Sequence, residues 1–126
     1  MAPNPVIYIV DDDEAVRDSL AVLFAVEGLD VRTERSAQAL LEDLPPAGPG
    51  CIITDVHMAE ISGVELLRRL KALRAPLPVI VTTGRAGTGL AAEIMAQGAA
   101  AFIEKPFSAD EIVSAVRTAL DEQVRG

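Results

Sequence analysis

Polar residues follow four apolar segments of the chain, at the point where each segment ends. They are Asp11 and Asp12 after residues 6–10, Asp55 at the end of 51–55, Thr83 at the end of 78–83, and Lys105 just beyond 99–103. If these segments are strands of one parallel sheet, their carboxyl ends lie at the same edge, and ligands bind in the crevice beyond it. We therefore expect these side chains to converge.

The chemistry that suits this set is phosphoryl transfer. Three carboxylates so close together repel one another unless a hard cation neutralises them, and Mg²⁺ binds a few carboxylates together with water and phosphate oxygens. A lysine and a hydroxyl beside them can hold an anion. Carboxylates are also nucleophiles that form aspartyl-phosphates, so the set points to a phosphoryl group on Asp55.

Each of these residues also has a purely structural interpretation. Asp55 alone could start a turn or cap a helix that begins near Gly63. Residues 11–14 could be a solvated helix start beside the positive end of the helix dipole, and Lys105 could be a surface lysine. Thr83 alone is uninformative. Their coincidence at the strand ends of one α/β unit favours the functional interpretation.

Strand and helix patterns alternate five times along the chain. The expected strands are 6–10, 29–33, 51–55, 78–83 and 99–103, and the expected helices lie around 16–24, at 37–41, around 64–70, at 90–97 and, capped by Ser108, around 112–120. Such alternation predicts right-handed crossovers and a parallel sheet with helices on both faces. Residues 29–33 alternate apolar and polar, which indicates an edge strand. We expect a rigid turn at the Pro/Gly run 45–50 and a mobile glycine-rich segment at 84–89.

Composition narrows the function further. The chain has 126 residues, the usual length of one domain, so we expect a single domain over 1–126. Its net charge of -8 repels phosphate backbones and argues against direct nucleic-acid binding. No apolar run is long enough for a membrane span and no leader is evident, which predicts a cytoplasmic protein. Cys51, the single cysteine, should be a buried reduced thiol, and Arg68, Arg69 and Lys71 a solvated helix face.

The motifs closely resemble those of the receiver domains of bacterial two-component response regulators, over essentially the whole chain. They are Val10-Asp11-Asp12, Thr54-Asp55 followed by Met58 and Ser62-Gly63, Thr83-Gly84, and Phe102-Ile103-Glu104-Lys105-Pro106-Phe107. The last of these, with Ile53-Thr54-Asp55 and Ser62-Gly63-Val64-Glu65-Leu66-Leu67, looks most like the FixJ/NarL-type subgroup. The resemblance implies a doubly wound, flavodoxin-like α/β fold with five parallel strands in the order 2-1-3-4-5 and five helices.

The resemblance also implies a role for each site residue. Asp55 would accept phosphate from a phosphohistidine on a sensor histidine kinase. Mg²⁺ would be held by Asp11, Asp12, Asp55 and the backbone of His57. Thr83 and Lys105 would hold the phosphoryl oxygens, Thr83 and Phe102 would form the switch, and His57 and Arg85 would tune the attack of water on the phosphoryl group.

The same resemblance suggests the output. Phosphorylation would change the surface formed by helix four, strand five and helix five, for homodimer formation or release of a C-terminal effector domain. The last residues resemble a final helix running into a linker, so we expect a regulator cut before such a domain. The chain would catalyse only its own phosphoryl transfer and dephosphorylation. It departs from the family at Ala59, where proline is usual, and in the glycine-rich segment 84–89.

Other functions fit the sequence less well. A receiver-like protein-binding module that accepts no phosphate ranks second, because all the acceptor residues are present. A phosphatase of the haloacid dehalogenase type needs a second aspartate at position 57, where His57 stands, and a cap for which there is no room. A flavodoxin-like nucleotide or flavin binder would need a phosphate loop after the first strand, where residues 11–14 would repel phosphate.

Overall fold

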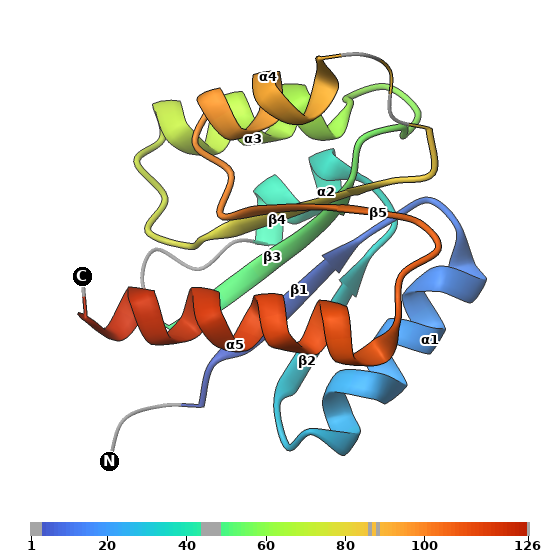
Figure 1. Cartoon of the computed structure of the whole chain (residues 1–126), viewed down its shortest axis with the longest axis vertical. Helices are drawn as coiled ribbons and strands as arrows, with labels where there is room; N and C mark the ends of the chain where they lie inside the picture. Colours follow the sequence, from blue (N-terminus) through green and yellow to red (C-terminus); the bar gives the residue numbers. More distant parts are fainter. Residues whose placement is uncertain (1–3, 44–48, 86, 88, 126) are drawn as a thin grey trace.

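The computed structural model describes residues 4–43, 49–85, 87 and 89–125 (Figure 1). Within them five parallel strands form one sheet in the order β2-β1-β3-β4-β5. The elements are β1 Val6–Val10, α1 Glu14–Val26, β2 Asp30–Glu34, α2 Ala37–Asp43, β3 Gly50–Asp55, α3 Gly63–Ala72, β4 Val79–Thr83, α4 Leu90–Ala96, β5 Ala101–Glu104 and α5 Ala109–Arg125. The predicted strand order and fold class are confirmed.

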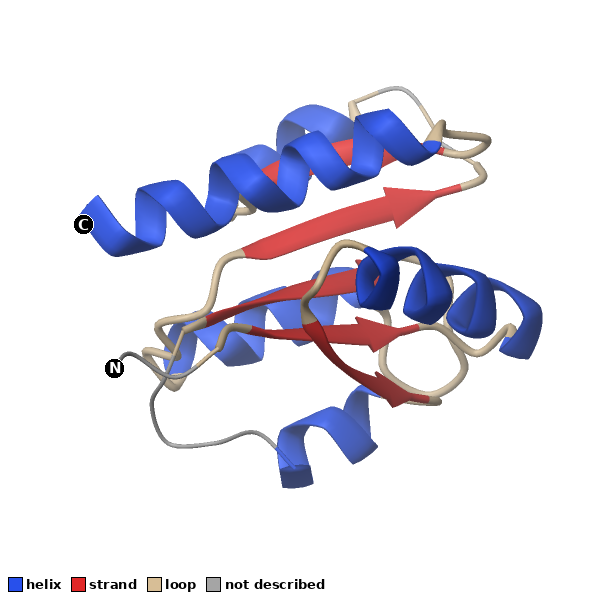
Figure 2. Cartoon of the chain, turned by 90° about the horizontal axis from the view of Figure 1, so that it is seen from below, coloured by secondary structure: helices blue, strands red, loops and turns tan. Residues whose placement is uncertain are grey.

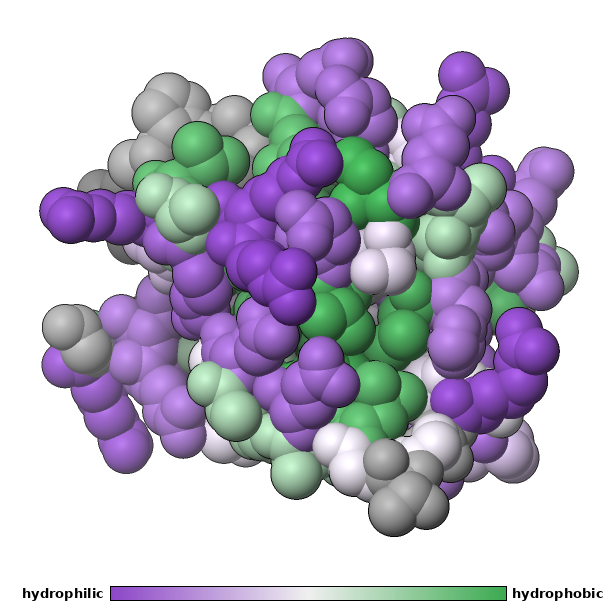
Figure 3. Space-filling model, turned by 90° about the horizontal axis from the view of Figure 1, so that it is seen from above, coloured by the Kyte–Doolittle hydropathy of each residue, from purple (hydrophilic) through white to green (hydrophobic). Residues whose placement is uncertain are grey.

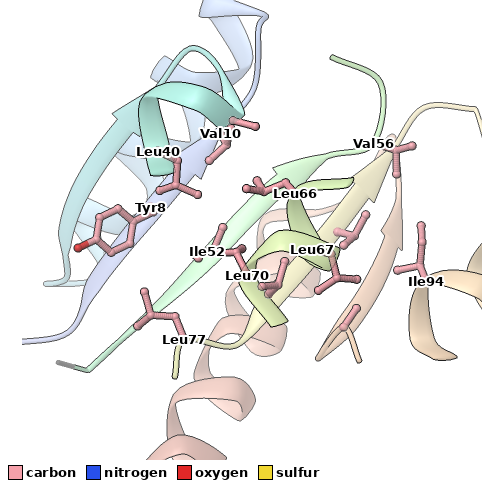
Figure 4. Close-up of a cluster of buried hydrophobic side chains, with 14 residues drawn as sticks. Tyr8, Val10, Leu40, Ile52, Val56, Leu66, Leu67, Leu70, Leu77 and Ile94 are labelled. Atoms are coloured by element: carbon pink, nitrogen blue, oxygen red, sulfur yellow. The ribbon is translucent and has the colours of Figure 1, made fainter. Parts of the chain in front are cut away.

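Helices cover both faces of the sheet (Figure 2). On one face α1 and α5 pack against Ile7, Ile9 and Ile53, with Phe24 of α1 fully buried between them. On the other face α2, α3 and α4 enclose a second apolar cluster, shown in Figure 4, which includes Tyr8 of β1. Successive side chains of a strand point to opposite faces, so β1 serves both clusters and has to be apolar throughout.

The predicted edge strand is confirmed, because β2 pairs only with β1 among the described residues. It is also the one described strand that has no buried residue. β3 is central and buried along its whole length. Cys51 within it is fully buried, and burial raises the pKa of its thiol to about 12, so it stays protonated and packs as a small hydrophobe.

Some boundaries differ from the sequence expectation. β5 begins at Ala101 rather than at residue 99, because the preceding turn contains Gly98 at a φ of 98°. Gly50 belongs to β3 instead of the preceding turn, and a Cβ there would overlap the carbonyl oxygen of Val6. The rest of the turn expected at 45–50 lies mainly outside the described residues, as do residues 86 and 88 of the glycine-rich segment. No described helix is long and apolar enough to cross a membrane.

One carboxyl group is partly buried where β2 meets α2. Glu34 ends β2, and its Oε2 is buried with no hydrogen-bond partner among the described residues. Asp43 at the end of α2 forms an ion pair of 2.7 Å with Arg32. Burial raises the pKa of Glu34 to about 7, and the neighbouring Asp43 carboxyl adds to the rise. Glu34 therefore releases its proton only near neutral pH.

We predict that this carboxyl makes stability fall as pH increases from 4.5 to about 7, since over that range the folded protein retains a proton that the unfolded chain has released. Glu34→Gln cannot titrate. The difference in free energy of unfolding between Glu34→Gln and the parent should therefore shift by about 1 kcal/mol in favour of the variant from pH 5 to pH 8. This value is reduced for solvent screening. Urea unfolding at both pH values measures this, with Glu42→Gln on the exposed side of α2 as control. Equal pH dependence in parent and Glu34→Gln would show that the pKa is ordinary.

Candidate functional site

The loop after β1 holds Asp11 rigidly at the carboxyl edge of the sheet. Asp11 is 2% exposed, and its Oδ1 accepts a hydrogen bond of 2.9 Å from the backbone N–H of Asp13. Arg17 of α1 donates to the backbone carbonyl of Asp11 at 2.6 Å. The remaining oxygen, Oδ2, lies 3.1 Å from Nζ of Lys105. The Asp11 side chain is thus held by the backbone of Asp13 and by Lys105, while Arg17 of α1 holds its backbone.

The four acidic residues 11–14 serve two different purposes. Asp13 caps α1, because its side chain accepts hydrogen bonds from the N–H groups of Ala15 and Val16. Glu14 is exposed in the first turn of α1, where the helix dipole favours a negative charge. The structural interpretation therefore holds for these two residues, whereas Asp11 and Asp12 take part in the carboxylate cluster.

Asp55 lies at the tip of the central strand β3, between β1 and β4. Its residue is 9% exposed, and Oδ2 is 3.5 Å from Nζ of Lys105. Oδ1 is buried and has no hydrogen-bond partner among the described residues. Asp55 does not cap α3: that position is taken by Ser62, whose Oγ accepts a hydrogen bond from the N–H of Glu65 at 3.1 Å.

The electrostatics of the site balance burial against charge. Burial raises the pKa of Asp55, the Lys105 ammonium lowers it, and the Asp11 carboxylate raises it again, so that the net direction is upward. For Lys105, burial alone would lower the pKa, but the hydrogen bond and charge of Asp11, with the charge of Asp55, outweigh it and raise the pKa. Lys105 is therefore a stable cation that partly compensates two carboxylates.

Asp11, Asp12 and Asp55 together form a cluster that fits a hard divalent cation. One carboxylate oxygen of each lies within 4.8 Å of those of the other two. The donors are all oxygens, which Mg²⁺ prefers, and the orphaned Oδ1 of Asp55 is a buried acceptor in need of a partner. Asp12 is exposed, so one side of the cluster is open to water and to an incoming group.

Thr83 is fully buried at the end of β4 and is engaged locally. Its Oγ1 accepts a hydrogen bond from the N–H of Arg85 at 3.1 Å and donates to the carbonyl of Arg85 at 3.2 Å. The carbonyl of Thr83 accepts from the N–H of Lys105 at 2.7 Å, which ties the ends of β4 and β5 together. Nε2 of His57 lies 3.2 Å from the carbonyl oxygen of Arg85. Residues 57, 83, 85 and 105 thus form one linked rim.

Phe102 lies apart from the carboxylate cluster. It sits in β5 beside Val81 of β4 and is partly buried against the α2–α3–α4 cluster. Thr83 is two residues beyond Val81, and side chains two apart in a strand share a face. Thr83 and Phe102 therefore occupy the same face of adjacent strands, on the side of α4.

Two further residues position the site, and only one of them, Gly63, carries a signal in the sequence. Arg17 is one helix turn beyond the acidic loop, and nothing in its spacing indicates that it reaches back to the carbonyl of Asp11. Gly63 begins α3 directly against Asp55: a Cβ there would overlap the backbone carbonyl of Asp55, and its N–H donates to the carbonyl of Val56 at 2.9 Å. The first turn of α3 can approach the strand tip only because residue 63 has no side chain.

The comparisons agree with this geometry. Residues 7–117 match the sequence model of the response regulator receiver domain. The chain is 49% identical over 114 residues to the transcriptional regulatory protein FixJ of Azorhizobium caulinodans, covering 90% of this chain and 54% of FixJ. It is 40% identical over 115 residues to the response regulator protein TodT of Pseudomonas putida, covering 91% and 51%. A crystal structure of FixJ-N is similar with a TM-score of 0.86 and 41% identity, covering 94% of this chain and 95% of that one.

The chain therefore belongs to the response regulator receiver domain family, and it is a receiver domain of the FixJ-like kind that acts in two-component signalling. Because the chain belongs to this family, the two alternative functions considered from the sequence, a dehalogenase-type phosphatase and a flavin binder, are excluded. The chain spans about half the length of the curated relatives that it matches.

Proposed function

We propose that this chain receives a phosphoryl group on Asp55 from the phosphohistidine of a sensor histidine kinase. The observation that carries the proposal is the buried Oδ1 of Asp55, which has no hydrogen-bond partner among the described residues, whereas Oδ2 of the same carboxylate lies 3.5 Å from Nζ of Lys105. A buried acceptor without a partner is costly, so its retention calls for a functional reason. Covalent attachment of a phosphoryl group, with its cation, provides one.

In this step a carboxylate oxygen of Asp55 forms a bond to phosphorus and the phosphorus–nitrogen bond breaks. The electron pair of that bond stays on the imidazole, which takes up a proton. Asp55 has to be ionised to attack, and the nearby Lys105 ammonium favours that state. Water later hydrolyses the acyl phosphate on Asp55, so the chain catalyses only its own phosphoryl transfer and dephosphorylation.

The charge of the incoming group needs compensation. Asp11, Asp12, Asp55 and the backbone of His57 would hold Mg²⁺, which when bound neutralises charge on the transferring phosphoryl oxygens. Lys105 is already a cation at the site, and after transfer its Nζ can leave Asp11 for a phosphoryl oxygen. Thr83 supplies a hydroxyl donor from β4. Rate tuning by His57 and Arg85 is supported by their place at the rim of the site.

An apolar groove beside the site suits the phosphodonor. It has a volume of about 340 Å³ and lies between α1 and the segment that follows β5. Val16 and Leu20 line it from α1, and Lys105, Pro106 and Phe107 line it from the segment after β5. An amphipathic helix of a cytoplasmic kinase segment could bury its apolar face there and bring a phosphohistidine to Asp55.

The output surface consists of α4, β5 and α5. A phosphoryl group offers oxygens that Thr83 can bond only after transfer, and movement of Thr83 toward them would leave room on the face that it shares with Phe102. Met95 of α4 is 45% exposed, and Figure 3, seen from the side of α3 and α4, shows apolar side chains reaching the surface amid polar ones. We infer that this surface forms a homodimer or releases a C-terminal effector domain, without itself contacting nucleic acid.

Acetyl phosphate with Mg²⁺ should add one phosphate to the parent chain, and Asp55→Asn should abolish the addition, because an amide is a far weaker nucleophile. Intact-protein mass spectrometry with and without chelator measures both effects. Asp13→Asn is the matched control: it removes one carboxylate nearby but keeps the helix cap, so labelling should persist. Equal labelling of Asp55→Asn and the parent would refute the assignment. No labelling of the folded parent would favour a protein-binding module that needs no phosphate.

Beryllofluoride, a phosphoryl mimic, should change amide exchange across residues 89–107 and increase self-association in sedimentation. Thr83→Ala should weaken both changes while leaving the mimic bound, because the hydroxyl transmits the signal. Thr82→Ala removes a hydroxyl from the opposite face of β4 and should leave the response intact. The switch surface is wrong if exchange changes only around Asp55 and association stays constant.

A further inference from the structure

The backbone of Arg85 is the meeting point of two side chains from different strands. His57, in the loop after β3, places Nε2 at 3.2 Å from the Arg85 carbonyl oxygen. Thr83, at the end of β4, bonds both the N–H and the carbonyl of the same residue, at 3.1 Å and 3.2 Å. The His57 side chain thus connects the loop after Asp55 to the backbone of Arg85, which is hydrogen-bonded to the Thr83 hydroxyl.

In this arrangement the Thr83 hydroxyl has no proton left to donate to another acceptor. A threonine hydroxyl has one proton, and that of Thr83 is given to the Arg85 carbonyl. It cannot be given at the same time to a phosphoryl oxygen. The Arg85 carbonyl can accept two hydrogen bonds, so His57 and Thr83 bind it together without competition. The imidazole donates from Nε2 in the matching neutral tautomer and in the cation alike.

We propose that His57 is a positioning residue whose ring holds the Arg85 backbone in the conformation that engages the Thr83 hydroxyl, and that it thereby opposes activation. We call this contact between His57 and Arg85 the latch. This proposal rests on the proposed phosphorylation of Asp55 and extends it. Its basis is that His57 is linked to both ends of the switch. Its ring contacts the partner of Thr83, and His57 lies only two residues beyond Asp55 in the loop that follows β3. A change at the acceptor can therefore release the latch through one residue.

The size of the effect should be modest. The contact is exposed to water, which replaces most of a lost hydrogen bond, so the latch biases the two arrangements by a few-fold. Removing it should leave global stability nearly unchanged, since the His57 side chain is exposed. It should shift the equilibrium toward the arrangement in which the Thr83 hydroxyl is free.

Three variants of the full chain test the latch: His57→Ala, which removes the donor, His57→Gln, which retains an N–H donor of similar reach, and Glu60→Ala in the same loop as control. Beryllofluoride is the probe, because it does not hydrolyse and so separates the equilibrium from attack by water. We expect His57→Ala to half-saturate at two- to fivefold lower beryllofluoride than the parent, and His57→Gln and Glu60→Ala to match the parent. In the free protein the Arg85 amide should exchange about two- to fivefold faster in His57→Ala only.

Unchanged beryllofluoride affinity in His57→Ala would overturn the latch, as would equal affinities of His57→Ala and His57→Gln. A parent chain that binds no beryllofluoride would instead refute the proposed phosphorylation. In that case the exchange rate of the Arg85 amide in the free protein still decides whether His57 holds this segment.

Discussion

The ion pairs of Lys105 with Asp11 and Asp55 are the interaction on which the site depends. Two buried carboxylates at the ends of adjacent strands repel each other, and the ammonium group at 3.1 Å and 3.5 Å makes their coexistence tolerable. One cation does not balance three carboxylates, so the cluster remains short of positive charge. This excess of negative charge favours binding of a divalent cation. A bound cation would in turn compensate the negative charge of a phosphoryl group.

The fold supplies this arrangement through parallel pairing. β1, β3 and β4 are held in register along their buried lengths, so their polar end residues share one edge, and β5 delivers Lys105 beside them through its bond to Thr83. Helix α3 adds a constraint, because Gly63 lets its first turn touch Asp55. The phosphoacceptor is thus set on a rigid strand, whereas its responders, Thr83 and Arg85, lie where β4 gives way to a loop.

Much of this was predictable from the sequence, for physical reasons. A continuously apolar run followed by a carboxylate indicates a buried strand with its tip at the ligand edge, which predicted the convergence of Asp11, Asp12, Asp55 and Lys105. Contacts between distant parts of the chain were not predictable, because they depend on how the helices pack against the sheet. Examples are the hydrogen bond from Arg17 to the carbonyl of Asp11 and the burial of the Glu34 carboxyl. The partition of the run 11–14 between cap and site depends on where α1 begins, which composition does not determine.

Mg²⁺ titration of the unphosphorylated chain, followed by amide chemical shifts, tests most directly whether the cluster is a cation site. We expect saturable binding at one site, with the largest shifts around Asp11, Asp12 and Asp55. Asp12→Asn should weaken it by about tenfold or more, whereas Asp18→Asn on the exposed face of α1 should not. Shifts that never saturate, or equal affinity in Asp12→Asn and the parent, would show that the carboxylate cluster is not a cation site.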